Sequence, residues 1–366
     1  MFIESVDLEN YRNYGSLHLD LGEGIHIFHG ENAQGKTNLI EALYLACTNK
    51  SYRGAKDKEL IQFGHEEGHI RIFTQKNENS YRIDMHLKAG RAKGIAVNGV
   101  PVKRARDFLG VMNAVIFSPE DLLLVKEGPQ ERRKFIDTEL CFLDKIYLNS
   151  YVQYKKALEQ RNQLLKDAAG DASLLGVLDV WDESLVKYGV PLIKARKKFT
   201  EDIKEFIKEV HEKLTGGKET LEVLYEGNVS ADDFAKELRK QRNRDLKAKT
   251  TTVGPHRDDL SFKITAADKE PIDARVFGSQ GQQRTCALSL KMAEIQYVTE
   301  ITKESPVLFL DDVLSELDGN RQRFLLESIK DIQTFITCTG LDDFISHRFK
   351  INKTYRVSNG VVLNDE

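Results

Sequence analysis

The stretch that most constrains the fold of this chain is GENAQGKT, at residues 30–37. It matches the pattern G-x-x-x-x-G-K-[ST], in which glycines let backbone N–H groups wrap around phosphate oxygens. The apolar run IHIFH precedes it and the helical pattern TNLIEALYLACTN follows it. A helix that starts at such a loop presents its positive dipole end to an anion. We therefore predict a phosphate-binding α/β fold, because a chance match in a glycine turn would lack the flanking strand and helix.

The loop also predicts individual roles for its residues. Lys36 is expected to reach the β- and γ-phosphates of a nucleotide, and Thr37 is expected to hold Mg²⁺. The residues predicted to surround the nucleotide are Gly30, Glu31, Asn32, Ala33, Gln34, Gly35, Lys36 and Thr37.

A second stretch, PVLFLDDVLSELD at residues 306–318, supplies an acidic partner for the loop. Its apolar residues predict a buried strand that ends at Asp311, where a carboxylate can meet the metal held at the loop. Asp312 follows, facing the place from which water would attack a γ-phosphate. A core strand that ends in a polar turn is the alternative interpretation, and the phosphate loop makes it the weaker one. Lys36, Asp311 and Asp312 are the predicted catalytic residues.

A third stretch, FGSQGQQ from residue 277, opens another apolar helix in the manner of a phosphate site. One nucleotide is expected per loop, so a second set of donors makes sense if it caps the γ-phosphate held by another copy of the chain. Two chains would then enclose two nucleotides about a two-fold axis. A plain helix capped by Ser279 explains the stretch equally well. The residues predicted to reach the partner's nucleotide are Ser279, Gly281 and Gln282.

The amino-acid composition predicts the cellular compartment of the protein but says little about its function. Hydrophobic residues make up 40 % and charged residues 30 % of 366, as in soluble globular proteins. No apolar run approaches the eighteen residues of a membrane span, so we expect no membrane partner. The cysteines have no metal-ligand spacing and no signal-peptide pattern is present, which predicts a cytoplasmic protein. A net charge of −3 neither indicates nor excludes nucleic acid as a partner.

The pattern of apolar residues changes twice along the chain. Strand patterns dominate the first part, helical spacing starts near residue 119, and strands with short helices return after about residue 250. We therefore predict one ATPase lobe, formed by residues 1–118 and 251–366, interrupted by a helical lobe at residues 119–250. The last predicted element is a hairpin whose turn is Asn359 and Gly360.

The order of these stretches resembles that of ABC-type ATPase heads, and further stretches resemble the bacterial RecF family over essentially the whole chain. They are LENYRNY at residues 8–14, SYR at 51–53, FSPEDLLLVKEGPQERRKFID at 117–137 and GPHRDD at 254–259, together with the three stretches described above. The resemblance implies an α/β fold with an ABC-type ATPase head of mixed sheets, a mainly helical second lobe and no long coiled coil.

The resemblance also implies a function. Members of the family act in recombinational repair and replication restart, dimerise on ATP and clamp DNA at single-strand/double-strand junctions. They hydrolyse ATP slowly, with stimulation by DNA, and work with RecR and RecO to bring RecA to gaps. The implied cofactors are ATP and Mg²⁺. The residues of this chain alone predict an ATP-gated homodimer, and its assignment to DNA rests on the family.

Some residues depart from the pattern of ABC-type heads. Asp312 stands where most ABC-type heads have a glutamate as base, and RecF proteins share this aspartate. The side chain is shorter than glutamate, which agrees with slow hydrolysis. Thr339 replaces the switch histidine of transporters, and Glu120 replaces the glutamine at the lobe junction. The identity of the water-positioning residue stays open. The remaining predicted contacts are Ser315 and Asp318 at the dimer seam and Arg53 to DNA or nucleotide.

Several basic patches are candidates for DNA binding, although each alone is more typical of a solvated helix face. They are Arg104 and Arg106, residues 132–134, residues 194–198 and the run RKQRNRDLKAK at residues 239–249. A clamp needs several phosphate contacts, so we expect some of these patches to line a groove. His256 and Arg257 are expected to be structural hydrogen-bonding groups and receive no role.

Three other functions share some of these features. A transporter motor subunit predicts a switch histidine, which is absent from the sequence. An SMC-like chromosome-organising head predicts helices of hundreds of residues, whereas one continuous helix over residues 130–169 would span only about 60 Å. A small-molecule kinase has the phosphate loop but has no use for SQGQQ or SELD. We see no nuclease carboxylate set and no Ser–His–Asp arrangement in the sequence, so we expect no chemistry on DNA.

Overall fold

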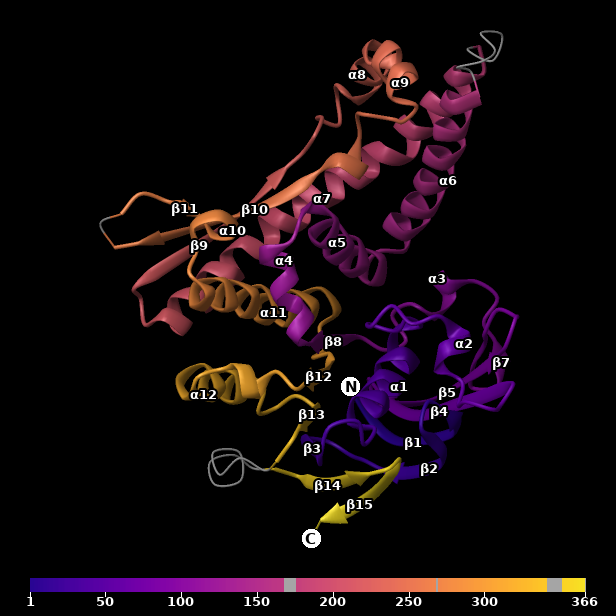
Figure 1. The fold of residues 1–366 in the computed structure, drawn as a ribbon, viewed down its shortest axis with the longest axis vertical. Coiled ribbons are helices and arrows are strands. Elements are labelled where there is room, and N and C mark those ends of the chain that lie inside the picture. The colour runs from indigo at the N-terminus through magenta and orange to yellow at the C-terminus, as the bar shows by residue number, and fades with distance from the viewer. Residues whose placement is uncertain (168–175, 268, 341–350, 366) are drawn as a thin grey trace. The chain divides into compact units, whose positions relative to one another are not determined.

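The computed structural model describes residues 1–167, 176–267, 269–340 and 351–365. They fall into two compact units, shown as a ribbon in Figure 1. Unit 1 comprises Met1–Asp121 and Glu294–Glu366, and unit 2 comprises Leu122–Ala293. Among the described helices, none is long and apolar enough to cross a membrane.

The first sheet of unit 1 has a parallel centre. Its strand order is β15-β14-β3-β13-β12-β8, and all neighbours are parallel except the edge hairpin of β14 and β15. Every residue of β12 and β13 is buried, which explains why these strands are nearly continuous apolar runs. The strands are β3 (Ile25–His29), β8 (Ala114–Phe117), β12 (Val307–Asp311), β13 (Thr334–Cys338), β14 (Lys353–Ser358) and β15 (Val361–Asp365).

The second sheet of unit 1 is antiparallel, with the order β2-β1-β4-β5-β6-β7. Alternating residues of β4 are buried, so this sheet has one core face and one open face. The strands are β1 (Phe2–Tyr11), β2 (Tyr14–Asp20), β4 (Glu67–Lys76), β5 (Asn79–Lys88), β6 (Gly94–Val97) and β7 (Val100–Pro101).

One helix fills the core of unit 1. Helix α1 (Lys36–Thr48) contacts β4 and β5 of one sheet and β8, β12 and β13 of the other. Eleven of its residues are buried, so its pattern is apolar on nearly all sides rather than amphipathic. The remaining helical segments of unit 1 are α2 (Asp57–Leu60), α3 (Ala105–Phe108), η1 (Pro119–Leu122, which reaches unit 2), η4 (Leu314–Glu316) and α12 (Gly319–Ser328).

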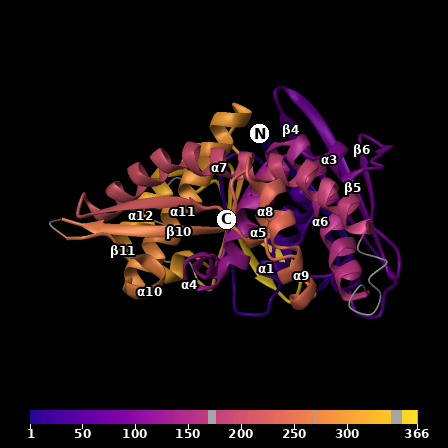
Figure 2. The same cartoon turned by 90° about the horizontal axis from the view of Figure 1, so that it is seen from above.

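Unit 2 combines helices with a three-stranded antiparallel sheet of order β11-β10-β9. Helix α7 packs against α6 and along β9, as the two views show (Figure 1 and Figure 2). Its helices are α4 (Leu123–Lys126), α5 (Pro129–Leu143), α6 (Lys145–Asp167), α7 (Leu178–Thr215), α8 (Phe234–Lys240), α9 (Arg242–Ala248), η3 (Pro255–Arg257) and α10 (Ala274–Phe277), followed by the start of α11 (Gln280–Thr302). Its strands are β9 (Glu219–Glu226), β10 (Asp259–Ala266) and β11 (Ile272–Asp273).

The structure differs from the predicted organisation at two places. Unit 2 extends to residue 293 rather than 250, because β9 pairs with β10 and the predicted boundary would divide their sheet. The helical pattern over residues 130–169 is divided at Asp144 into α5 and α6. Helix α7 runs from Leu178 to Thr215 with Pro191 in its interior. The hairpin turn is confirmed, with left-handed φ values of 48° at Asn359 and 75° at Gly360.

The GPHRDD stretch lies at the polar centre of unit 2. Asp258 is 1 % exposed and accepts hydrogen bonds from the Arg196 guanidinium and from the N–H of Asn228. Arg196 also binds Asp137 and the carbonyl oxygen of Pro255, so that α5, α7 and η3 share one cation. A buried charge is tolerated only when its hydrogen bonds are satisfied. The stretch therefore holds the helices of unit 2 to its sheet.

Gly254 is required by this arrangement. Its φ of 135° disfavours any residue with a side chain, and an added Cβ would lie 2.6 Å from the Tyr154 hydroxyl. Tyr154 uses that hydroxyl to bind Nδ1 of His256, at 2.7 Å. Nε2 of His256 donates to the carbonyl oxygen of Thr251, so Nδ1 is the acceptor of the Tyr154 hydrogen bond.

The buried His256 predicts a pH-dependent stability. Burial lowers its pKa from 6.5 to about 4, so the folded state keeps it neutral while the unfolded chain protonates it near its ordinary pKa. The contribution of neutral His256 to the free energy of unfolding is therefore complete above about pH 6.5 and is lost as the pH falls towards 4. At about pH 5 the loss amounts to about 2 kcal/mol. Urea unfolding followed by circular dichroism should show this loss in the wild type and a smaller one in His256→Gln. The control His65→Gln, at an exposed residue of unit 1, should match the wild type; equal pH profiles in all three proteins would contradict the prediction.

Candidate phosphate-binding site

The loop at residues 30–35 connects β3 to α1, and its glycines have conformations that other residues rarely adopt. Gly30 has a φ of 148°, and an added Cβ would lie 2.4 Å from the carbonyl oxygen of Val357. Gly35 has a φ of 119° and is the N-cap residue of α1. The first turn of α1 therefore has its N–H groups at the loop, as an anion site requires.

Two turns that are distant in sequence bind the loop through Gln34. Its carbonyl oxygen accepts from the Asn13 side chain, which follows β1, and from the N–H of Gly360, each at 3.0 Å. Its side-chain oxygen accepts from the N–H of Asn359 at 2.7 Å. An added Cβ at Gly360 would lie 2.4 Å from the carbonyl oxygen of Asn13, so the two turns touch. The loop is therefore fixed by contacts from outside itself.

Lys36 is 8 % exposed and folds back over the loop. Its ammonium donates to the carbonyl oxygens of Gly30, at 2.5 Å, and Glu31, at 2.7 Å. Burial lowers the pKa of Lys36, and the carboxylates of Asp312 and Asp311 oppose that shift. A phosphate group in the loop would offer this cation a stronger acceptor than two neutral carbonyls.

The carboxylate of Asp311 is 7 % exposed and accepts from three hydroxyl groups. Thr37 and Thr337 donate to Oδ1, at 2.9 and 2.8 Å, and Tyr52 donates to Oδ2, at 2.7 Å. Burial and the charge of Asp311 raise the pKa of Tyr52, so its hydroxyl stays protonated and can donate. The structure thus brings together Lys36, Thr37 and Asp311, three of the residues predicted from two separate stretches. Hydroxyl and carboxylate oxygens are ligands that Mg²⁺ prefers.

Asp312 follows in a left-handed conformation with a φ of 55°. Its N–H donates to the Thr337 hydroxyl at 3.0 Å, and its carbonyl oxygen accepts from Ser315 at 2.9 Å. This turn points the chain away from β12, so consecutive aspartates do not share one environment: Asp311 is buried and Asp312 is partly exposed. Asp318 is exposed and caps α12 by accepting from the N–H groups of Asn320 and Arg321.

Three further predicted residues of unit 1 have different surroundings. Arg53 is half-exposed beside α1, where it reaches Asn38 at 3.4 Å and Glu41 at 3.7 Å. Thr339 is exposed directly after β13, and Glu120 is exposed in η1. Thr339 therefore follows the strand that contributes Thr337 to the site.

The predicted second helix start belongs to unit 2, where it forms a capping box. Ser279 Oγ accepts from the N–H of Gln282, and the side-chain oxygen of Gln282 accepts from the N–H of Ser279 at 2.8 Å. The interpretation as an N-capped helix is confirmed. Ser279 and Gly281 are exposed, and an added Cβ at Gly281 would meet open space. Val276 and Phe277, just before this start, are 65 % and 70 % exposed.

Sequence reasoning missed the residues that support the site from outside the three stretches. Tyr52, Thr337, Asn13 and Gly360 all bind the loop or Asp311. Gly360 was predicted only as a hairpin turn, and the other three were assigned no role. Tyr52 lies in the stretch SYR and Asn13 in the stretch LENYRNY, both of which resemble a known family. This resemblance was the only indication in the sequence that the two residues belong to the site. A hydroxyl residue near the end of a buried apolar strand was the signal for Thr337.

Two of the proposed DNA-binding patches are partly buried. Arg132 is 3 % exposed and forms a bidentate pair with Asp259, and Arg196 is also 3 % exposed and binds Asp137 and Asp258. Their predicted exposure was wrong, because each guanidinium serves the core of unit 2. Lys197 and Lys198 are exposed but pair with Glu201 and Asp202 along the same helix. Residues 239, 244, 247 and 249 are exposed, and no ion pair within 4.0 Å involves them among the described residues.

Comparisons with known proteins agree with this geometry. Residues 2–362 match the family model described as the RecF/RecN/SMC N terminal domain. The chain is 52 % identical to the DNA replication and repair protein RecF of Lachnospira eligens, over 100 % of both chains. A solved structure of the recombination mediator protein RecF-ATP in the RecFOR pathway has a TM-score of 0.90 and 35 % identity, with 100 % of this chain and 98 % of that chain covered. The Smc head domain of Pyrococcus furiosus, at 16 % identity and a TM-score of 0.59 over 100 % of this chain and 96 % of that one, shares the fold. The predicted fold class is confirmed.

Proposed function

We propose that this chain, which belongs to the RecF family of DNA replication and repair proteins, is an ATP-dependent DNA clamp of recombinational repair and replication restart. ATP would bind in the loop of residues 30–37, and Mg²⁺ would lie between its phosphates, Thr37 and Asp311. The observation that carries the proposal is the joining of Lys36, Thr37 and Asp311 at the start of α1. The relatives' names and the solved RecF-ATP structure support the nucleotide.

The side chains fit ATP with Mg²⁺. Gly30 and Gly35 allow the positive φ values of the loop, where an added Cβ would collide with Val357 or Asn13. The Lys36 ammonium lies over the loop and donates only to neutral carbonyl oxygens, which are weak acceptors. Bound Mg²⁺ would neutralise charge on the phosphates. Asp311 orients the Thr37 hydroxyl, and Lys36 attracts the terminal phosphate. Asp312, one residue beyond the strand, would accept a proton from the attacking water, and its short side chain supports slow turnover. Hydrolysis would reset the clamp without chemistry on DNA.

The hydrogen bonds of Thr337 predict a role in metal affinity. Thr337→Val removes one donor to Asp311 and the acceptor of the Asp312 N–H without changing the shape of the side chain. Loss of such a supporting contact should raise the Mg²⁺ concentration for half-maximal ATP binding by about tenfold. Binding of a fluorescent ATP analogue over a Mg²⁺ titration measures the shift. The matched control is Thr334→Val in the same strand, whose hydroxyl binds the carbonyl of Ile332. Equal shifts in both variants would reject a specific role for Thr337.

The exposure of the start of α11 supports an ATP-dependent homodimer. Ser279 and Gly281 are exposed at the start of α11, and an added Cβ at Gly281 would meet open space. Another molecule can therefore approach the backbone of this helix start closely. The exposed Val276 and Phe277 beside them would be buried in such a contact. Ser279, Gly281 and Gln282 would then face the γ-phosphate in the partner's loop, with Ser315 and Asp318 at the seam.

Solution mass with and without ATP and Mg²⁺ tests this dimer. Wild-type chains should change from monomer to dimer when ATP is added. Ser279→Arg should bind ATP in its own loop yet stay monomeric, because the bulky cation blocks the partner's nucleotide. Lys36→Met should lose ATP binding and dimerisation together. The proposed arrangement is wrong if Ser279→Arg dimerises like the wild type, or if ATP does not change the solution mass of the wild type.

The DNA-binding part of the proposal rests on family membership and on exposed basic residues. Arg244, Lys247 and Lys249 on and after α9 are candidates for phosphate contacts in unit 2, with Arg239 on α8. DNA at single-strand/double-strand junctions would stimulate the ATPase. RecR and RecO would act with the clamp in the cytoplasm to bring RecA to gaps, as the RecFOR pathway named for the solved relative suggests.

Charge reversal on α9 should weaken DNA binding without changing ATP binding. The double variant Arg244→Glu/Lys247→Glu removes two candidate phosphate contacts. The slope of the logarithm of the binding constant against the logarithm of the salt concentration should therefore decrease in magnitude by about two. Fluorescence anisotropy with a gapped duplex, in ATP and over a range of salt, measures both quantities. Lys197→Glu/Lys198→Glu is the matched control, because both lysines already pair with carboxylates. An unchanged α9 variant, or an equal loss in the control, would exclude α9 as the contact surface.

A further inference from the structure

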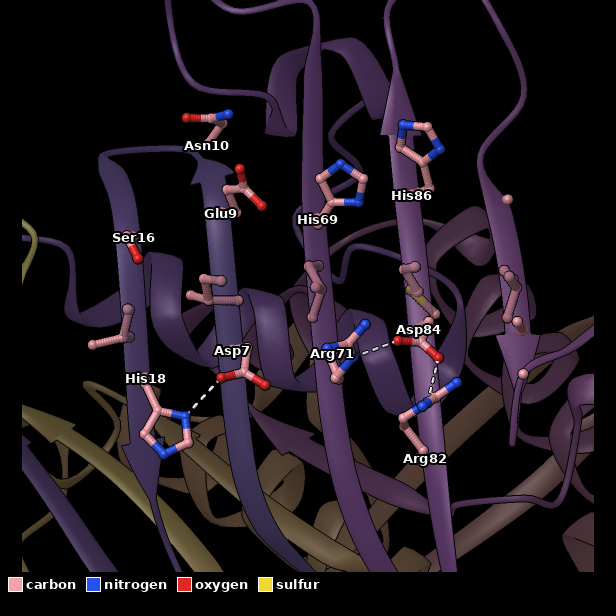
Figure 3. Close-up of a pocket in the computed structure, with 18 of the residues that line it drawn as sticks. Asp7, Glu9, Asn10, Ser16, His18, His69, Arg71, Arg82, Asp84 and His86 are labelled. Atoms are coloured by element: carbon pink, nitrogen blue, oxygen red, sulfur yellow. Dashed lines mark hydrogen bonds and ion pairs between the residues drawn. The ribbon is translucent and has the colours of Figure 1, made fainter.

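The open face of the antiparallel sheet in unit 1 has polar residues arranged in rows across the strands. Glu9, His69 and His86 are opposite one another on β1, β4 and β5, and Asp7, Arg71 and Asp84 form the next row. Figure 3 shows the two histidines side by side, with Glu9 next to His69 and the ion-paired row below them. This face is hollowed into a pocket of about 830 Å³. The residues that line the pocket do not include residues 30–37 of the phosphate loop.

His69 and His86 line this pocket, and Glu67 lies beside them as a third potential metal ligand. Glu67, His69 and His86 each offer one ligand atom, and these atoms all lie within 4.8 Å of one another. The imidazole rings of His69 and His86 are stacked, with centroids 4.4 Å apart, and Nε2 of His86 lies 3.0 Å from a carboxylate oxygen of Glu67. Neighbouring antiparallel strands hold the two histidines in register, so the pairing does not depend on a loop.

We propose that Glu67, His69 and His86 form a binding site for a zinc-class transition-metal ion. Two imidazoles and one carboxylate are a donor set that suits Zn²⁺, whereas Mg²⁺ prefers oxygen ligands alone. Three protein ligands leave a fourth position for water. The nearby Glu9 adds negative charge on the same face, which favours a cation. The site is separate from the proposed ATP site and does not depend on it.

Small side-chain movements would complete the coordination. Ligand atoms bound to one tetrahedral Zn²⁺ lie about 3.3 Å apart, since each bond is about 2.0 to 2.2 Å long. The three side chains are exposed or half-exposed, so the rings can turn from their stacked position without disturbing the core. The backbone spacing between the paired strands stays as it is.

Lys88 is the competitor of the metal in this arrangement. Its ammonium binds the second carboxylate oxygen of Glu67, while His86 binds the first. A metal ion must share or displace this cation. Removing the charge of Lys88 should therefore strengthen metal binding, whereas damage to the sheet would weaken it. This opposite sign separates a metal site from a structural cluster.

Calorimetric titration of the metal-stripped full-length chain with ZnCl₂, without nucleotide, tests the site. The wild type should bind one Zn²⁺ per chain, and Co²⁺ at the same site should give the visible absorption of a four-coordinate ion. His69→Ala and His86→Ala should each weaken binding by at least about tenfold. Lys88→Met should bind more tightly than the wild type. His65→Ala, at an exposed histidine outside the cluster, should leave the affinity unchanged.

Several results would overturn the proposal. They are binding of less than one Zn²⁺ per chain, a Co²⁺ spectrum of a six-coordinate ion, or equal losses in His65→Ala and His69→Ala. Weaker binding in Lys88→Met would also contradict it. Circular dichroism of each variant confirms that the sheet is intact. ATP binding is measured on the same samples, so failure of the metal site and failure of the ATP site give different results.

Discussion

The carboxylate of Asp311 is almost removed from water, so its charge has to be satisfied by hydrogen-bond donors. The donors come from three parts of the chain: Thr37 at the start of α1, Tyr52 after that helix, and Thr337 on the neighbouring strand. Each donor fixes the position of its own element relative to β12. The order of strands in the central sheet and the placing of α1 against it are therefore linked to one negative charge.

Unit 2 contains buried side chains of the opposite charge, and these also have to be paired. Arg161 is fully buried and binds Asp182 and Asp245, which connects α6, α7 and α9, while Arg196 connects α5, α7 and η3. Because an unpaired buried guanidinium is very costly, these helices are restricted to the arrangement that pairs both cations. The same cations cannot serve as DNA contacts. A basic residue in this lobe is available for phosphate only if the core does not use it.

Much of the candidate phosphate site could be predicted from the sequence because its residues lie in short, continuous stretches whose patterns predict their roles. The loop, Asp311 and the turn at Asn359 and Gly360 were recognised this way, and the α9 residues were recognised as exposed. Two kinds of feature were missed. Contacts between segments far apart in sequence, such as Asn13 with Gln34, leave no local pattern. Burial of Arg132 and Arg196 depends on acidic partners on other elements. The histidine pair of β4 and β5 is equally hidden, because strand register rather than spacing brings it together.

The contacts of Gln34 have a consequence for the order in which the chain is made. The loop and the turn that binds it are separated by 325 residues, so the ribosome produces the loop on the order of tens of seconds before its partner. Unit 2 is one continuous segment and can fold during that interval. The central sheet cannot, since β12 to β15 are still missing. Newly made chains should therefore pass through a stage in which the inserted lobe is folded within an unfinished host, exposed to chaperones and proteases.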